Sequence, residues 1–169
     1  MERISKHISY KEAIKSNTAL RLNIDNTPDS ISLINMTGVA SNIFEPLRLW
    51  VGGPIKINSF YRCPKLNRAI GGSKRSQHCE GRAVDIDDTF GYKTNAEMFN
   101  YIRENLNFDQ MIWEFGDNLN PAWVHVSFDS LDQNRGRVLK AIKENGRTQY
   151  IPIWVNQEKS LDKQQLGKY

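Results

Sequence analysis

The ten residues from Ser76 to Asp85 read SQHCEGRAVD, and this stretch decides how the chain folds around a site. His78 ends a loop rich in glycine, serine and lysine over residues 71–77, and Asp85 follows in the predicted strand 83–87. Side chains alternate along a strand, so the two aliphatic neighbours of Asp85 point to the opposite face. A carboxylate between aliphatic neighbours is costly to bury unless it is paired or binds a metal. The stretch therefore predicts a role for Asp85 beyond packing.

A second segment reads WVHVSF over residues 123–128 and has the same alternation. His125 shares a face with the tryptophan and the serine, and the aliphatic residues between them point into the core. If this strand lies beside the one that carries Asp85, the imidazoles of His78 and His125 and the carboxylate can bind one Zn²⁺. Zinc sites with three protein ligands keep one position for water, whereas structural sites are usually closed by four. These residues therefore predict a catalytic zinc ion.

Two further residues are candidates for the chemistry around such an ion. Glu114 lies in the predicted strand 110–115, and we expect it to act as general base, taking a proton from water and returning it to the leaving amine. Arg62 follows directly after a predicted strand and can hold a substrate carboxylate or carbonyl through charge-assisted hydrogen bonds. The simpler alternatives are an exposed strand carboxylate for Glu114 and an ion pair at a helix start for Arg62.

These segments resemble the zinc DD-carboxypeptidase family, which includes peptidoglycan-cleaving phage endolysins and D-Ala-D-Ala dipeptidases. The family is related in fold to the lysostaphin-type peptidases and the hedgehog signalling domain. The resemblance runs from about Ser9 to Ile153, and it implies a peptidoglycan peptide as substrate and one Zn²⁺ as cofactor. The residues that match its Ser-x-His-x-x-Gly-x-Ala-x-Asp, Trp-Val-His and Tyr-Arg-x-Pro motifs are Ser76, His78, Gly81, Ala83, Asp85, Trp123, Val124, His125, Tyr61, Arg62 and Pro64. The stretches similar to a phage and bacterial branch are Leu22–Pro28 and Phe44–Arg48.

Two positions depart from the family pattern. Phe60 stands where a glycine often precedes the Tyr-Arg pair, and Ala122 stands where some members carry their catalytic acid. Alanine cannot transfer a proton, so geometry and similarity to the branch assign the role of base to Glu114. Ser76 and Trp123 are candidates for substrate contact, and their simpler roles are to shape the loop and to line the cleft or core.

Length, composition and charge indicate the number of domains and the kinds of partner to expect. With 169 residues, of which 39% are hydrophobic, we expect one zinc peptidase domain over residues 1–155 and a polar C-terminal tail over residues 156–169. The net charge of +4 suits an anionic partner, but the chain lacks the dense basic stripe of a nucleic-acid-binding protein, so we expect no nucleic-acid partner. No apolar run is long enough to span a membrane, and the polar start lacks the apolar stretch of a secretory signal. We expect a monomer made in the cytoplasm that acts on the cell wall after phage release or as part of a virion.

The order of the expected elements predicts an α+β fold, because helices come first and strands with short turns follow. We expect a mostly antiparallel sheet with helices packed on one side and the zinc site on the sheet. Asn145–Gly146 predicts a hairpin turn, and Thr94–Glu97 predicts the start of a helix through a capping box.

The longest helix is expected to start with Thr27 as N-cap and Pro28 in the first turn, and to run to about Trp50. Pro46 lies within it and predicts a kink or an early end. The apolar stripe expected to face the core consists of Ile31, Ile34, Val39, Ile43, Phe44 and Leu47.

The sequence thus predicts a zinc metallopeptidase that hydrolyses an amide bond in the stem peptides or cross-bridges of peptidoglycan. Carboxypeptidase and endopeptidase both remain open, because both would use the same zinc ligands. The alternative is a non-catalytic zinc-binding recognition module on the same fold. A position of Glu114 beside the zinc site would favour catalysis, and a position away from it would favour binding alone.

Overall fold

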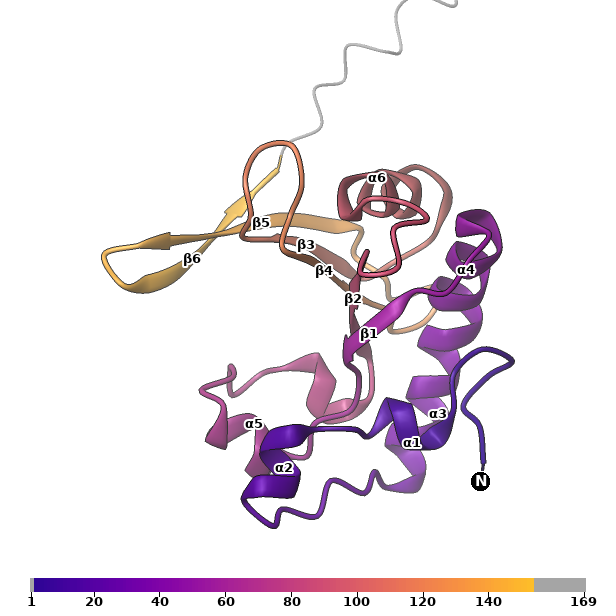
Figure 1. Cartoon of the computed structure of the whole chain (residues 1–169), viewed down its shortest axis with the longest axis vertical. Coiled ribbons are helices and arrows are strands. Elements are labelled where there is room, and N and C mark those ends of the chain that lie inside the picture. Colours follow the sequence, from indigo (N-terminus) through magenta and orange to yellow (C-terminus); the bar gives the residue numbers. More distant parts are fainter. Residues whose placement is uncertain (1, 154–169) are drawn as a thin grey trace, which may run out of the picture.

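The computed structural model describes residues 2–153, which form a six-stranded sheet with helices around it (Figure 1). The strands are β1 (Lys56–Ser59), β2 (Ala83–Asp87), β3 (Gln110–Glu114), β4 (Trp123–Ser127), β5 (Arg137–Glu144) and β6 (Arg147–Pro152). Their order in the sheet is β1-β2-β4-β3-β5-β6, and every neighbouring pair is antiparallel except β3 and β5, which are parallel. The predicted α+β class with a mostly antiparallel sheet is confirmed. The predicted tail over residues 156–169 lies outside the described residues.

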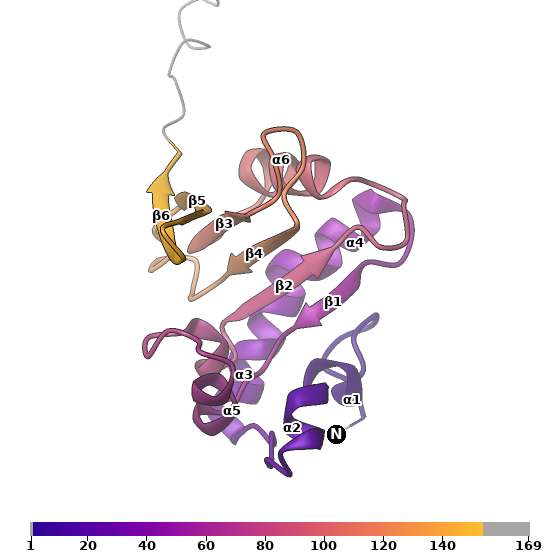
Figure 2. The ribbon, with the colours of Figure 1, turned by 60° about the vertical axis from the view of Figure 1, so that its left-hand side comes forward.

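Helices make up most of the first half of the chain and pack mainly on one face of the sheet. The helical segments are α1 (Tyr10–Ala13), α2 (Asn17–Arg21), α3 (Ser30–Val39), η1 (Ala40–Phe44), α4 (Glu45–Val51), α5 (Pro64–Ala69), η2 (Gln77–Glu80) and α6 (Asn95–Asn105). The rod formed by α3, η1 and α4 runs behind β1 and β2, and α6 lies near its far end (Figure 2). Apolar side chains from these helices pack against Val84, Val124 and Val126 of the sheet in one core. The opposite face of the central strands is therefore left for a site.

The long helix begins later than predicted. Its N-cap is Asp29, whose carboxylate accepts a 2.7 Å hydrogen bond from the amide of Ser32. Thr27 instead donates a 2.6 Å hydrogen bond from its hydroxyl to the carboxylate of Asp25. The prediction of Thr27 as N-cap is wrong, because Thr27 is engaged in a local turn and aspartate caps a helix at least as well as threonine.

The start of the predicted apolar stripe is also wrong. Ile31 and Ile34 are each 70% exposed, and the helix turns Ser32 and Met36 inward instead. The turn at Gly81 packs tightly here: a Cβ atom on Gly81 would lie 2.4 Å from the carbonyl oxygen of Ser32, and the residue has a φ of +71°. Only glycine allows this approach, which brings η2 against α3. The rest of the predicted stripe is buried, namely Val39, Ile43, Phe44 and Leu47.

The rod does not end at Pro46. Just before the proline, η1 is a π-helical turn in which the amide of Glu45 donates to the carbonyl of Ala40. In a regular α-helix the proline ring would clash with the carbonyl four residues earlier, and widened turns of this kind accommodate such irregularities. The helix resumes as α4 and stops at Gly52, which has a φ of 74°.

Two local signals in the second half of the chain form the structures that the sequence predicts. Thr94 and Glu97 form the predicted capping box at the start of α6. Asn145 and Gly146 both have positive φ values, 49° and 75°, as a tight hairpin turn requires, and they join β5 to β6. This hairpin extends beyond the rest of the sheet, away from the helices (Figure 1).

Candidate metal centre

Two neighbouring strands and one short helix bring three donor side chains together. Asp85 in β2 is the direct cross-strand partner of His125 in β4, and His78 reaches both of them from η2. The Nδ1 atom of His125 lies 2.9 Å from Oδ1 of Asp85, and Nε2 of His78 lies 3.2 Å from each of these two atoms. All three residues are buried, and together they can hold one metal ion. The structure thus assembles the three residues that the sequence predicts as ligands.

The chemistry of this donor set fits zinc. Zinc binds imidazole nitrogens and carboxylate oxygens at about 2.0–2.2 Å, so tetrahedral ligands lie roughly 3.3 Å apart. The Nδ1 atom of His78 lies 2.7 Å from the backbone carbonyl oxygen of Phe60. Nδ1 therefore carries the proton and donates it, and Nε2 presents a lone pair toward the other two donors. A lone pair directed in this way is available to a cation shared with Asp85 and His125.

The surroundings favour the protonation states that bind metal. Burial by itself raises the pKa of Asp85, but the charges and hydrogen bonds of His78 and His125 outweigh it, and the pKa lies far below its ordinary value. Burial, together with the charges of His125 and Arg62, lowers the pKa of His78 although Asp85 acts in the opposite direction. An ionised carboxylate and a neutral imidazole are the forms that bind metal, and they are the forms favoured at Asp85 and His78.

Glu114 lies at the end of β3, in the same cavity as the three donors. It is the cross-strand partner of Trp123, is only 7% exposed, and lines this cavity of about 490 Å³. Burial raises the pKa of Glu114 to about 7, and the charge of Asp85 adds to this, while His125 and Arg62 act in the opposite direction. A carboxyl group with a pKa near neutrality can take up and return a proton at neutral pH.

An apolar floor accounts for the burial of Glu114. Ile112, Leu139 and Ala141 form a small cluster of buried side chains apart from the main core. Ala141 in β5 is the direct partner of Glu114, and Ile112 and Leu139 line the cavity. The carboxylate loses contact with water over this floor, which disfavours its charged form.

The three residues predicted to contact substrate line the same cavity. They are Arg62, Ser76 and Trp123. The Nη2 atom of Arg62 donates a 3.4 Å hydrogen bond to the hydroxyl of Ser76, and its backbone amide donates to the carbonyl of His78 at 3.2 Å. The ring of Trp123 packs against that of Phe115 with centroids 5.4 Å apart. The structure brings these residues to the cleft, and their contact with substrate stays a prediction.

A second cavity extends the cleft across the sheet. It has a volume of about 690 Å³ and shares Arg62, Ile70, Asp85 and Trp123 with the first. Its remaining walls come from β1, from residues 12–18 of the N-terminal helices and from Tyr61 and Phe90, whereas the first cavity is walled by residues 71–77 and by β3, β5 and β6. Since β1 and β3 lie on opposite sides of β2 and β4 in the sheet, the cleft continues on both sides of the donors.

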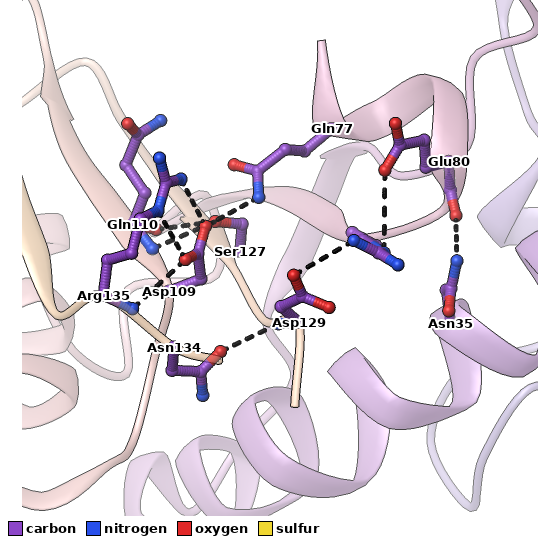
Figure 3. Close-up of polar contacts among 10 residues, drawn as sticks. Asn35, Gln77, Glu80, Asp109, Gln110, Ser127, Asp129, Asn134 and Arg135 are labelled. Carbon is purple, nitrogen blue, oxygen red and sulfur yellow. Dashed lines mark hydrogen bonds and ion pairs between the residues drawn. The ribbon is translucent and has the colours of Figure 1, made fainter. Parts of the chain in front are cut away.

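A buried carboxylate ties η2, which carries His78, to the sheet (Figure 3). Gln77 donates a 2.7 Å hydrogen bond to Asp109, and Arg135 donates two more at 2.6 and 2.7 Å. Burial by itself raises the pKa of Asp109, but the hydrogen bonds from Arg135 and Gln77 outweigh it and lower the pKa to about 2. This ion pair holds the residue next to His78 in place.

The far end of η2 is held by a second set of contacts (Figure 3). Asn35 in α3 donates a 2.8 Å hydrogen bond to the backbone carbonyl of Glu80. Arg82 lies 3.1 Å from the carboxylate of Asp129 and 3.6 Å from that of Glu80. The short helix is thus attached at both ends to elements distant in sequence.

The sequence analysis missed two residues of this region. Asp109 contacts Gln77 and Arg135, which are 32 and 26 residues away, and no local pattern marks such a partner. Tyr150 lines the cavity from β6. The sequence predicts a strand around Tyr150, but it does not show which strands lie next to it. The parallel pairing of β5 with β3 places Tyr150 beside the cleft.

Two imidazoles and a carboxylate that can share a metal ion, with a further buried carboxyl group in the same cavity, are a donor set that suits a metallopeptidase. The family model described as peptidase M15 matches residues 6–127, and the chain therefore belongs to the peptidase M15 family of zinc-dependent enzymes. This confirms the resemblance inferred from the sequence. A comparison with curated proteins gives no match.

Within residues 2–153, no helix combines the length and apolar character needed to cross a membrane.

Proposed function

We propose that this peptidase hydrolyses an amide bond in the peptide part of peptidoglycan, with one Zn²⁺ held by His78, Asp85 and His125. The observation that carries the proposal is the position of Glu114, which is buried in the same cavity as the three donors and has a pKa raised to about 7. The M15 family supports peptidase activity. The resemblance to peptidoglycan-cleaving enzymes supports the substrate.

Each residue of the cleft has a role in this proposal. When bound, zinc polarises the scissile carbonyl and makes the attacking water more acidic. Glu114 accepts the proton of that water on its carboxylate and returns it to the leaving amine. Arg62, beside Ser76, orients the substrate by hydrogen bonds to a carbonyl or carboxylate, and Trp123 forms a wall against which the peptide packs.

The two-sided cleft supports an endopeptidase over a carboxypeptidase. A carboxypeptidase binds a chain that stops just beyond the scissile bond, and a pocket closed on that side suffices. Here cavities of about 490 and 690 Å³ extend to either side of Asp85, which gives room for a peptide that continues in both directions. The substrate in this proposal is therefore an internal bond of a stem peptide or cross-bridge.

The remaining parts of the proposal concern the chain as a whole. The position of Glu114 favours catalysis over a non-catalytic zinc-binding module. We further propose one domain over residues 1–155 that acts as a monomer on the cell wall, as a lysin released by a phage or carried in a virion. The resemblance to phage endolysins supports this setting.

Digestion of purified peptidoglycan, followed by mass analysis of the released fragments, tests the proposal. The wild-type chain loaded with zinc is expected to release defined peptides, and the position of the new termini identifies an internal bond. His125→Ala should lose both zinc and activity. Glu114→Gln should keep zinc at one equivalent and lose activity by on the order of 10²–10⁴-fold.

A matched control for Glu114→Gln is Glu144→Gln, which removes an exposed carboxylate at the end of β5. Activity of this control should equal that of the wild type. Near-normal turnover by zinc-loaded Glu114→Gln would show that Glu114 is not the base. Release of single terminal amino acids alone would show a carboxypeptidase.

A further inference from the structure

The β5–β6 hairpin lies beyond the residues that match the family model, yet it forms one wall of the cleft. The match ends at residue 127, and β5 begins at Arg137. Arg137, Leu139 and Tyr150 of the hairpin all line the cavity that holds Glu114. We propose that Tyr150 contacts the peptide substrate and closes the Glu114 side of the cleft. This inference rests on the proposed peptidase function.

The register of the sheet places Tyr150 in one row with residues of the cleft. Trp123 pairs with Glu114, Glu114 with Ala141, and Ala141 with Tyr150, across β4, β3, β5 and β6. Directly paired residues of neighbouring strands point to the same face of a sheet. Tyr150 therefore projects from the face that carries the metal donors, since Trp123 and His125 share a face in β4.

Ala141 lies between Glu114 and Tyr150 in this row, and its small side chain leaves space above the sheet. Ala141 is fully buried and fills little space between Glu114 and Tyr150. A tyrosine ring can therefore lean over the alanine toward the carboxylate. With 53% of its surface exposed, Tyr150 still has room to pack against a ligand.

Tyr150 lines the same cavity as the polar residues Glu114, Asp85 and Arg62. Burial raises the pKa of Tyr150, and the negative charges of Glu114 and Asp85 raise it further, while Arg62 acts in the opposite direction. The phenol therefore stays protonated at neutral pH and can donate a hydrogen bond. A peptide group offers a matching carbonyl acceptor and a flat surface for the ring, so the chemistry of the side chain suits a peptide chain.

The test compares two neighbouring residues of β6. Tyr150→Thr removes the ring and hydroxyl but keeps a β-branched residue, which a strand accepts. Ile151→Thr is the matched control, because Ile151 is 46% exposed and points to the opposite face. The rate of hydrolysis of a soluble stem peptide, zinc content and circular dichroism are measured for each variant. Peptide affinity is measured separately in a zinc-loaded Glu114→Gln background, where no turnover interferes.

Tyr150→Thr is expected to lower kcat/KM and peptide affinity by about tenfold, with zinc content and folding unchanged. Ile151→Thr should stay within about twofold of the wild type. Tyr150→Phe, which keeps the ring, should lose less than Tyr150→Thr. The inference is overturned if Tyr150→Thr stays within the range of the control, or if both threonine variants lose activity equally. The proposed function fails separately, if the wild-type chain releases no peptide at all.

Discussion

Asp109 accepts a 2.7 Å hydrogen bond from Gln77, the residue that directly precedes His78. The same carboxylate forms an ion pair with Arg135, and its side chain is only 3% exposed. One buried charge therefore connects the turn that carries a metal donor, the start of β3 and the segment that leads into β5. This junction joins three parts of the cleft region that are distant in sequence.

Asp109→Asn is expected to lower the free energy of unfolding by roughly 2 kcal/mol at pH 7, because the folded state loses a charged partner for Arg135. The pKa of Asp109 is lowered from 3.8 to about 2, so its contribution is present above pH 3.8 and is lost as the pH falls toward 2. In urea unfolding of the metal-free wild type and variant from about pH 7 to about pH 2, the two free energies of unfolding should differ at pH 7 and converge as the pH falls from 3.8 toward 2.

The control for this prediction is Asp129→Asn. The side chains of Asp129 and its partner Arg82 are 31% and 33% exposed, and pairs of this kind contribute about 0–1 kcal/mol. A loss as large as that of Asp109→Asn, or curves for Asp109→Asn that stay parallel to the lowest pH, would contradict the assignment.

Zinc is expected to stabilise the folded chain. The three converging donors bind the ion only when folded, so zinc at about 100 times its Kd should add about 2.7 kcal/mol to the free energy of unfolding. Thermal unfolding after treatment with a chelator, and again after zinc is restored, measures the shift. Mg²⁺ at the same concentration should have little effect, because it prefers oxygen ligands. An unchanged melting temperature with zinc would argue against a metal site at His78, Asp85 and His125.

The activity should fall in acid through protonation of Glu114. A base must be ionised, and the pKa of Glu114 is raised to about 7, so kcat/KM is expected to rise with pH up to neutrality and to be lost below it. A bound divalent cation favours the carboxylate and moves this limb to lower pH. The pH profile of kcat/KM on a soluble stem peptide measures the limb. An acidic limb centred well above pH 7 would point to a different group.

Gly81→Ala is expected to lower the free energy of unfolding by more than about 2 kcal/mol, because the new Cβ would meet the backbone of Ser32 at 2.4 Å. Gly91→Ala is the matched control: Gly91 has the same φ of +71°, but its Cβ would have nothing within 4 Å. The control should lose only about 1 kcal/mol, from the left-handed backbone alone. Equal losses in urea unfolding would show that the close approach to α3 has no energetic consequence.

The sequence predicted those parts of the site that follow from local backbone geometry. Alternation along a strand is a property of the chain itself, so it placed Asp85 and His125 on matching faces, and the structure pairs them directly. The capping box at Thr94 and the turn at Gly146 are equally local and are present. The roles of Glu114 and the other cleft residues stay predictions until the variants are measured.

The features that the sequence did not predict depend on contacts between distant segments. Ile31 and Ile34 have the spacing of core residues, but the approach of Gly81 to the backbone of Ser32 decides which side of α3 faces inward. The ion pair of Asp109 and the place of Tyr150 both require knowing that β5 lies parallel to β3. Hydropathy patterns do not report such pairings.

The attachment of the β5–β6 hairpin has a consequence for engineering. The hairpin joins the sheet through β3 alone, at the opposite edge from β1, and it contributes none of the three metal donors. Grafting a hairpin of different length or composition onto this edge would leave the ion-binding framework in place. Chimeras that keep Leu139 and Ala141 beneath Glu114 would show whether the preference for a peptide can be exchanged while hydrolysis is retained.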